Sequence, residues 1–162
     1  MSRDFYQQEI LPFAGIIIKI CRAYTDTESD FEDYYQEVCL QIWRSRAQFR
    51  GSSEWSTFIY RITLNVCLTL FRKDKKKKVE RAFPENLNLE TSNDAFQNED
   101  VQMLYSAIKQ LKDVDRVLIL LYLEDKSYKE IGEVLNLNAN NVGVRVKRIK
   151  ERLKKIIDGK LN

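Results

Sequence analysis

The sequence predicts an all-α protein made of two small helical domains joined by a flexible acidic linker. Apolar residues recur at steps of three and four along most of the chain, which is the spacing of one helix face. Five glycines and two prolines in 162 residues are too few for an all-β or low-complexity chain. Residues 82–100 lack the helical periodicity and hold five acids without a base, so we expect them to link a domain over residues 1–81 to a second over residues 101–162.

Composition excludes several classes of function. The chain has no histidine, which removes His-based acid–base and nucleophilic catalysis, and it has no glycine-rich phosphate loop. Cys21, Cys39 and Cys67 are widely spaced, and we expect buried thiols rather than a metal site or a disulfide framework. No apolar run reaches the length of a membrane span, and the N-terminus lacks a signal-peptide pattern. We therefore expect a cytoplasmic protein that is not an enzyme, does not insert into membranes and needs no metal or cofactor.

The net charge of +3 conceals blocks of alternating sign. Residues 1–43 contain eight acids against three bases, and residues 44–81 contain eleven bases against three acids. Beyond the acidic linker, residues 101–162 contain thirteen bases against eight acids. Alternation of this kind indicates more than one partner surface, with two separate sites for a polyanion.

The first two helices are predicted from their apolar spacing and their start signals. One helix covers about residues 4–24, and Pro12 should kink it or start a new turn, because proline removes a backbone donor. Ser29 and Glu32 fit a capping box, so a second helix should begin there and continue to about Arg46.

The third helix should run from Trp55 to about Lys73, and its outer face has two interpretations. Leu68 and Phe71 lie on that face, where apolar exposure often marks an interaction site. The alternative is that neighbouring elements bury the helix on both sides. The lysine-rich run over residues 73–81 is typical of a solvated, flexible tail, and beside this helix it would also strengthen phosphate binding.

The second domain is predicted to end in two helices joined by a tight turn. Ser127 and Glu130 form a capping box for the first, and Asn138 is a suitable N-cap for the second. An almost wholly apolar helix over residues 116–123 should be the core against which the pair packs. The last helix has an apolar stripe at helical spacing, made of Val142, Val146, Ile149, Leu153 and Ile156.

The segment from residue 138 to residue 155 carries seven bases against one acid. A short helix, a polar turn and a basic amphipathic helix form the helix-turn-helix pattern, in which the second helix enters the major groove of DNA. The alternative is a surface helix whose charged face is merely solvated.

Two separated blocks match one protein family in order and spacing. Residues 33–38 (DYYQEV) with residues 42–44 (IWR) resemble the D-x-x-Q-E-V…W-R signature of region 2 in bacterial sigma factors. The following helix resembles that family's W-L-Y-R-I-x-x-N…R pattern through Phe58, Ile59, Tyr60, Arg61, Ile62, Asn65 and Arg72. Residues 127–131 (SYKEI), with Val142, Arg145 and Arg148, resemble the S-Y-x-E-I-A…V-x-x-R-x-x-R pattern of region 4. Nearly the whole chain is thus similar to a small extracytoplasmic-function (ECF) sigma factor of the sigma-70 family.

The resemblance implies that the chain binds core RNA polymerase and directs it to promoters. In region 2, the residues implied to bind the clamp helices of the largest polymerase subunit are Asp33, Gln36 and Glu37. An acidic helix start offers charge-assisted hydrogen bonds to arginines, although acids also stabilise a helix N-terminus without any partner. Members of this family are commonly held by anti-sigma proteins, so such a partner is expected too.

The loop before the third helix and the helix itself are implied to bind and melt the −10 element. Melting requires an extruded base held by aromatic and polar groups, with cations along the single strand. The base-pocket candidates are Phe49, Arg50, Ser52 and Ser53, and the strand-contact candidates are Arg61, Asn65 and Arg72. Trp55 and Phe58 are expected in the core rather than as stacking platforms.

The basic helix is implied to read the −35 element. Amides bind adenine edges, cations bind guanine and apolar groups touch the thymine methyl. The matching residues are Asn140 or Asn141 for adenine, Lys147 or Arg148 for guanine, and Val144 for thymine, with Arg145 and Arg152 on phosphates. Gly132 replaces the family's usual alanine and permits close helix contact.

A homodimeric helix-turn-helix regulator that works without polymerase is the alternative function. It would need a self-complementary surface, for which Leu68 and Phe71 are the candidates. That function leaves Asp33, Gln36 and Glu37, and the loop with Phe49, without a purpose.

Overall fold

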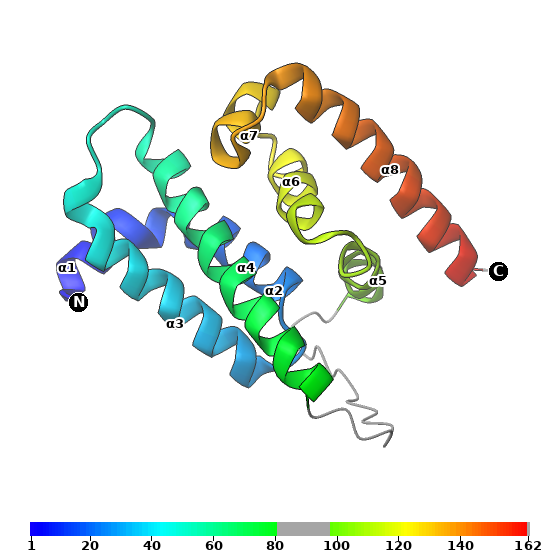
Figure 1. Ribbon diagram of the computed structural model, residues 1–162, viewed down its shortest axis with the longest axis horizontal. Helices are drawn as coiled ribbons and strands as arrows, with labels where there is room; N and C mark the ends of the chain where they lie inside the picture. The colour runs from blue at the N-terminus through cyan, green and yellow to red at the C-terminus, as the bar shows by residue number, and fades with distance from the viewer. Residues whose placement is uncertain (81–97, 162) are drawn as a thin grey trace.

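The computed structural model describes residues 1–80 and 98–161, and all regular structure in these two segments is helical (Figure 1). The first segment holds α1 (Arg3–Phe5), α2 (Ala14–Ala23), α3 (Glu28–Ser45) and α4 (Trp55–Glu80). The second holds α5 (Glu99–Ile108), α6 (Asp113–Leu123), α7 (Tyr128–Leu135) and α8 (Ala139–Leu161). The all-α prediction is confirmed. Residues 82–97 of the predicted linker lie outside the described residues.

The helices form two groups that pack against each other. Helix α4 lies between α3 on one side and the C-terminal helices on the other (Figure 1). Helices α2 and α4 make the contacts with α6 and α7, while α8 packs on α5, α6 and α7. Buried apolar side chains from both groups belong to one continuous cluster.

Pro12 interrupts the N-terminal helical segment, as the sequence predicts. After α1 come a π-helical turn (Tyr6–Ile10) and a 3-10 turn (Leu11–Phe13), and α2 begins only at Ala14. Because proline has no backbone N–H to donate, the regular hydrogen-bond pattern is restored beyond it.

Helix α3 begins two residues earlier than predicted, so the capping box assigned to Ser29 and Glu32 is wrong. Thr27 is the N-cap, and its Oγ1 accepts a hydrogen bond from the Asp30 N–H at 3.1 Å. The earlier start puts Glu28 and Asp30 in the first turn, where negative charge interacts favourably with the helix dipole.

Helix α4 continues through the lysine-rich run to Glu80, so the predicted flexible tail is wrong for residues 73–80. Lysine is a good helix former and is favourable near a helix C-terminus. A tertiary contact also anchors this end, because the Tyr34 hydroxyl of α3 donates a hydrogen bond to Asp74 at 2.8 Å.

The outer face of α4 is covered by neighbouring elements, which settles the open question about that face. Leu68 is buried and Phe71 is half-buried. The Phe71 ring packs edge-on against Tyr24 of α2, with ring centroids 5.5 Å apart. These side chains are part of the shared core and do not form a free apolar patch.

The two-helix motif at the C-terminus has the predicted local structure. Ser127 and Glu130 form the capping box of α7, and the Asn138 side chain accepts a hydrogen bond from the Asn141 N–H at 2.8 Å at the start of α8. Helix α7 ends at Asn136, which has a left-handed backbone (φ 57°). A Cβ on Gly132 would lie 2.3 Å from the Leu137 carbonyl oxygen, so glycine is what lets the turn close this tightly.

The position of the α3 cap is testable by mutation. Thr27→Ala should reduce the free energy of unfolding by about 1 kcal/mol, because the Asp30 N–H loses its acceptor. The melting temperature should fall by about 3 °C in calorimetry. Ser29→Ala is the matched control and should have little effect. A larger loss from Ser29→Ala would mean that the helix starts where the sequence predicts.

Candidate nucleic-acid interface

The outer face of α8 presents an exposed row of polar and basic side chains. Asn140, Asn141, Val144, Lys147, Arg148 and Arg152 are all exposed, and 51% of the Val144 surface is accessible. Arg145 is also exposed, but it forms an ion pair with Asp115 of α6 at 3.8 Å. The structure therefore places all seven predicted −35 residues on one helix, six on open surface and one against a carboxylate.

The orientation of α8 is set by its buried stripe and by aromatic contacts. Val142, Val146, Ile149 and Leu153 are buried, as predicted, and Ile156 is half-buried. A Cβ on Gly143 would lie 3.2 Å from the Tyr128 ring, so α7 and α8 approach closely here. Lys150 donates a hydrogen bond to the Tyr122 hydroxyl at 2.6 Å. These contacts keep the polar face of the helix outward.

The loop before α4 is built on three packed aromatic rings. The Phe49 centroid lies 5.1 Å from that of Trp55 and 5.2 Å from that of Phe58, and Trp55 and Phe58 stack at 5.3 Å. The Trp55 Nε1–H also donates to the Glu9 carbonyl oxygen at 2.9 Å. The rings are half-buried, so one face of the cluster remains accessible beside the loop.

The polar members of the loop follow Phe49 in the sequence and reach solvent. Arg50 and Ser52 are exposed and Ser53 is half-buried. Gly51 has φ 74°, a left-handed backbone that a residue with a side chain rarely adopts. The four predicted base-pocket residues thus belong to one short loop, in which Phe49 packs in the aromatic cluster and the three polar residues are exposed or half-buried.

The three predicted strand contacts on α4 are exposed, but the C-terminal helices engage two of them. The Arg61 Nε–H donates to the Glu133 carbonyl oxygen of α7 at 2.7 Å. Arg72 forms an ion pair with Asp113 of α6 at 3.5 Å. Asn65 is exposed between them.

The three predicted polymerase-binding residues of α3, two acids and a glutamine, line a groove of about 360 Å³ on the side of α4 away from the C-terminal helices. Asp33 and Gln36 are exposed, and Glu37 is half-buried, 4.0 Å from Arg44. Sequence reasoning missed the rest of the lining, which is Asp30, Tyr34, Leu40, Leu70 and Asp74. Asp30 and Leu40 lie three residues from Asp33 and Glu37, a helical spacing that could have identified them.

The groove floor is fixed by the hydrogen bond from Tyr34 to Asp74. Burial, followed by this hydrogen bond to a carboxylate, raises the pKa of Tyr34 well above its usual value. The phenol therefore stays protonated and keeps donating at neutral pH. This contact joins α3 to α4 beneath the acidic side chains.

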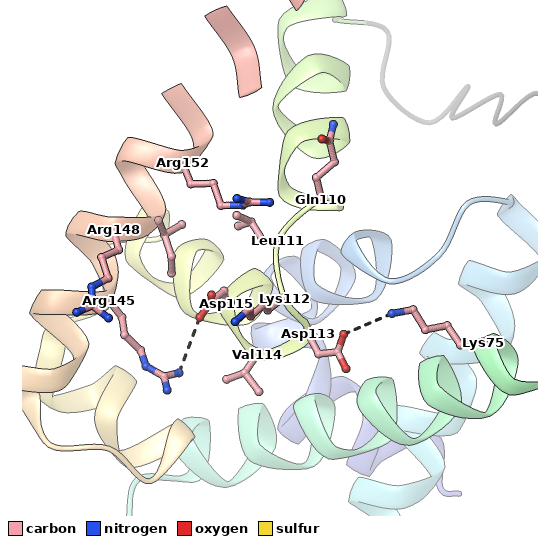
Figure 2. Close-up of a pocket in the computed structure, with 11 residues that line it drawn as sticks. Lys75, Gln110, Leu111, Lys112, Asp113, Val114, Asp115, Arg145, Arg148 and Arg152 are labelled. Atoms are coloured by element: carbon pink, nitrogen blue, oxygen red, sulfur yellow. Dashed lines mark ion pairs between the residues drawn. The ribbon is translucent and has the colours of Figure 1, made fainter. Parts of the chain in front are cut away.

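A basic cavity of about 820 Å³ lies where α4, α6 and α8 meet (Figure 2). Its charged lining consists of Lys75, Lys112, Asp113, Asp115, Arg145, Arg148 and Arg152. Sequence reasoning missed Lys75, Lys112 and the two acids. These residues come from separate elements, and no sequence pattern brings them together.

The three cysteines are buried and free, as predicted. Burial raises the pKa of the Cys39 thiol to about 11. The contact with Cys21, at 3.9 Å between the sulfur atoms, and burial raise the pKa of Cys67. Within the described residues, no cluster of acids and cysteines could hold a metal ion, and no helix is long and apolar enough to cross a membrane.

The thiols should therefore react slowly in the native protein. With a pKa near 11, about 0.1% of Cys39 is thiolate at pH 8, and the fraction increases as pH rises towards 11. A disulfide reagent such as DTNB should label the native chain slowly at pH 8 and label all three thiols quickly in urea. Fast labelling of the native protein would contradict the buried positions.

Comparison with known proteins identifies both halves of the chain. A family model described as Sigma-70 region 2 matches residues 12–77, and one described as Sigma-70, region 4 matches residues 101–153. The ECF RNA polymerase sigma factor SigW of Bacillus subtilis is 30% identical over 95% of this chain and 89% of its own length. The ECF RNA polymerase sigma-E factor of Haemophilus influenzae is 25% identical, over 78% of this chain and 74% of its own.

Two solved structures share the fold over nearly the whole chain. One is the sigma factor RpoE in complex with the anti-sigma factor NepR from Bartonella quintana, with a TM-score of 0.73 at 19% identity, covering 97% of this chain and 98% of that one. The other is CnrH in complex with the cytosolic domain of CnrY, with a TM-score of 0.70 at 19% identity, covering 98% and 90%.

Proposed function

This chain belongs to the ECF sigma factors of the sigma-70 family, and on that premise we propose that three separate surfaces divide the work of starting transcription. The observation that supports the division is the placement of opposite charges. The acidic groove of α3 and the exposed basic face of α8 lie on opposite sides of the molecule, with α4 between them (Figure 1). One surface can therefore hold polymerase while the others hold DNA.

The acidic groove is proposed to bind the clamp helices of the largest polymerase subunit. Asp33, Gln36 and Glu37 offer carboxylate and amide oxygens to arginines, and charge-assisted hydrogen bonds of this type are the stronger ones in interfaces. Leu40 and Leu70 add apolar surface to the same groove. A mixed lining of this kind provides both affinity and orientation.

The loop with Phe49, Arg50, Ser52 and Ser53 is proposed to capture an extruded base of the −10 element. A half-buried aromatic ring offers a surface for stacking, and the exposed polar groups around it can bind base edges and phosphate. Arg61, Asn65 and Arg72 would then follow the strand along α4.

The outer face of α8 is proposed to read the −35 element. Asn140 and Asn141 match adenine edges, Lys147 and Arg148 match guanine, and Val144 is free to touch a thymine methyl. Arg145 and Arg152, at the edge of this face, would bind phosphates and fix the register.

An anti-sigma partner and a cytoplasmic location are proposed as well. The solved sigma factor RpoE, which has the same fold, is bound there to the anti-sigma factor NepR. A protein that works with core polymerase and promoter DNA must act where both are present, which in bacteria is the cytoplasm.

The homodimeric regulator is disfavoured by the position of its candidate surface. Leu68 and Phe71 pack within the chain itself and are not free to pair two copies. In vitro transcription tests the choice directly: the chain with core polymerase should start RNA from a cognate promoter in a pool of genomic fragments. Absence of any chain-dependent transcript would overturn the sigma-factor mechanism.

Replacement of Asp33, Gln36 and Glu37 together should abolish binding to core polymerase. The triple variant Asp33→Ala, Gln36→Ala, Glu37→Ala should lose pull-down of core, because the groove loses its charge-assisted acceptors. The variant Asp4→Ala, Gln7→Ala, Glu9→Ala removes the same residue types from exposed N-terminal positions and should bind normally. Equal binding by both triple variants would show that the groove is not the polymerase-binding surface.

Helix α8 should make both base-specific and phosphate contacts with DNA. Arg148→Ala should weaken binding to −35 duplex by about 1–3 kcal/mol and relax specificity at the base pair it contacts, with a smaller effect on scrambled duplex. Lys154→Ala, at another exposed position on α8, should weaken both duplexes equally. With about five cations on phosphates, the logarithm of the wild-type affinity should fall with log salt at a slope near −4.5. A slope near zero in fluorescence anisotropy would argue against DNA binding.

A further inference from the structure

The basic cavity between α4, α6 and α8 carries an excess of positive charge. Its lining holds five cations against two carboxylates. Asp113 lies 4.0 Å from Lys75 and Asp115 lies 3.8 Å from Arg145, so each carboxylate neutralises one cation of the lining. Within residues 1–80 and 98–161, the remaining cations of the lining form no ion pair, and these are Lys112, Arg148 and Arg152.

The cations reach the cavity from separate walls (Figure 2). Lys75 extends from α4 towards Asp113, while Arg145 and Arg152 extend from α8 towards the start of α6 and the loop before it. Lys112 directly precedes α6. A compact anion can enter such a space and meet cations from several directions. A DNA duplex is convex and carries its phosphates on the outside, so it can touch only one wall at a time.

The cavity also has an apolar part, which strengthens the attraction of its cations for an anion. Leu111 and Ile149 belong to the lining and are buried, and Val114 is half-buried beside them. Apolar walls lower the effective dielectric constant, and a cleft lined by one sign of charge concentrates the electric field. The same side chains offer a surface to an uncharged part of a ligand.

Size and charge together select the class of ligand. The volume of about 820 Å³ lies within the range of about 300–1,000 Å³ that is usual for small-molecule sites. A phosphate group carries about −1.5 to −2 charges at pH 7, so two or more linked groups are needed to balance the unpaired cations. Arginine binds phosphate through two parallel hydrogen bonds, and lysine binds it as a point charge. A short chain of linked phosphates meets both requirements.

We propose that the basic cavity is a binding site for a short oligophosphate chain, which is held by Lys75, Lys112 and the three arginines of α8. The site goes beyond the proposed function, because its charge and shape do not depend on polymerase or promoter DNA. One consequence does rest on the proposed function. Since Arg145, Arg148 and Arg152 also belong to the surface proposed for the −35 element, a bound oligophosphate and a −35 duplex exclude each other.

The test is calorimetric titration of the full-length chain with inorganic tripolyphosphate in the absence of magnesium. The wild-type chain should bind it in a one-to-one complex. The double variant Lys75→Met, Lys112→Met removes two cations of the lining that are not among the predicted −35 residues, and it should bind at least about tenfold more weakly. Both lysines are exposed, and methionine retains their high helix propensity.

The matched control is the double variant Lys76→Met, Lys129→Met. It removes the same charge from exposed positions of α4 and α7 that lie outside the lining, and it should bind tripolyphosphate as tightly as the wild-type chain. Equal weakening by the two double variants would overturn the site, because it would reduce the binding to a general attraction between opposite charges. Absence of saturable binding to the wild-type chain would overturn it as well.

Two nucleotides identify the source of the phosphate chain. ATP carries as many phosphates as tripolyphosphate, so equal affinities support a site for inorganic oligophosphate. Tighter binding of ATP supports a nucleotide site, in which the nucleoside contacts the apolar side chains of Leu111 and Ile149. AMP has a single phosphate and should bind far more weakly than ATP. Equal affinities for AMP and ATP would contradict recognition of a phosphate chain.

A scrambled DNA duplex tests the rival occupant of the cavity. If Lys75→Met, Lys112→Met weakens binding of this duplex but not of tripolyphosphate, the cavity serves the DNA backbone and the proposal is wrong. The outcome is independent of the sigma-factor mechanism. A chain that binds tripolyphosphate in the expected way but starts no transcript with core polymerase would overturn the proposed function and leave the oligophosphate site standing.

Discussion

The arrangement of this chain depends on the buried guanidinium of Arg116. It lies at the carboxyl ends of α2 and α5, where the helix dipoles are negative, and it donates hydrogen bonds to carbonyl oxygens of both. Burial lowers its pKa, but nearby Tyr24 and Asp113 oppose that effect, and the group stays charged at neutral pH. Hydrogen bonds to a charged group contribute about 1.5–3 kcal/mol each, so separation of the halves must offset their loss by solvation or by new partners.

Charge and apolar surface have separate roles where α6 and α7 pack against α2 and α4. Apolar side chains such as Leu64 and Leu68 supply the area removed from water, which is not directional. The polar contacts of α6 with α2 and α4 are directional, so they fix the orientation in which these apolar surfaces pack. Asp113 makes two of these polar contacts, because its backbone carbonyl accepts from Tyr24 while its carboxylate neutralises Arg72. The same first turn of α6 also holds Asp115, which forms an ion pair with Arg145 of the surface proposed for the −35 element.

The distribution of charge along the chain has a direct structural counterpart. The acidic block of residues 1–43 includes the groove on α3, and the basic blocks include α4 and α8. This arrangement separates the surface proposed for polymerase from the surfaces proposed for DNA. Two acids within the second basic block, Asp113 and Asp115, pair with Arg72 and Arg145, so they reduce the positive charge of the surfaces proposed for DNA.

The sequence by itself determined the helices, the capping box at Ser127, the buried stripe of α8 and the family. These features depend on residues three or four positions apart, and such local patterns can be recognised in the sequence alone. The predicted start of α3 is wrong because Thr27 and Ser29 are both suitable caps, and the structure uses Thr27, which accepts from the Asp30 N–H. The lysine run was misjudged because its helical state depends on α4 being anchored upstream and at Asp74.

Only the tertiary structure decided which surfaces are open. Arg61 and Arg72 are equally exposed candidates in the sequence, yet both are engaged by groups about 40 to 70 residues further along the chain. The basic cavity of Lys75, Lys112 and the arginines of α8 arises from elements that no short-range pattern connects. Long-range pairing of this kind depends on how the helices pack. The residues next to a side chain in the sequence do not indicate which distant residue it will contact.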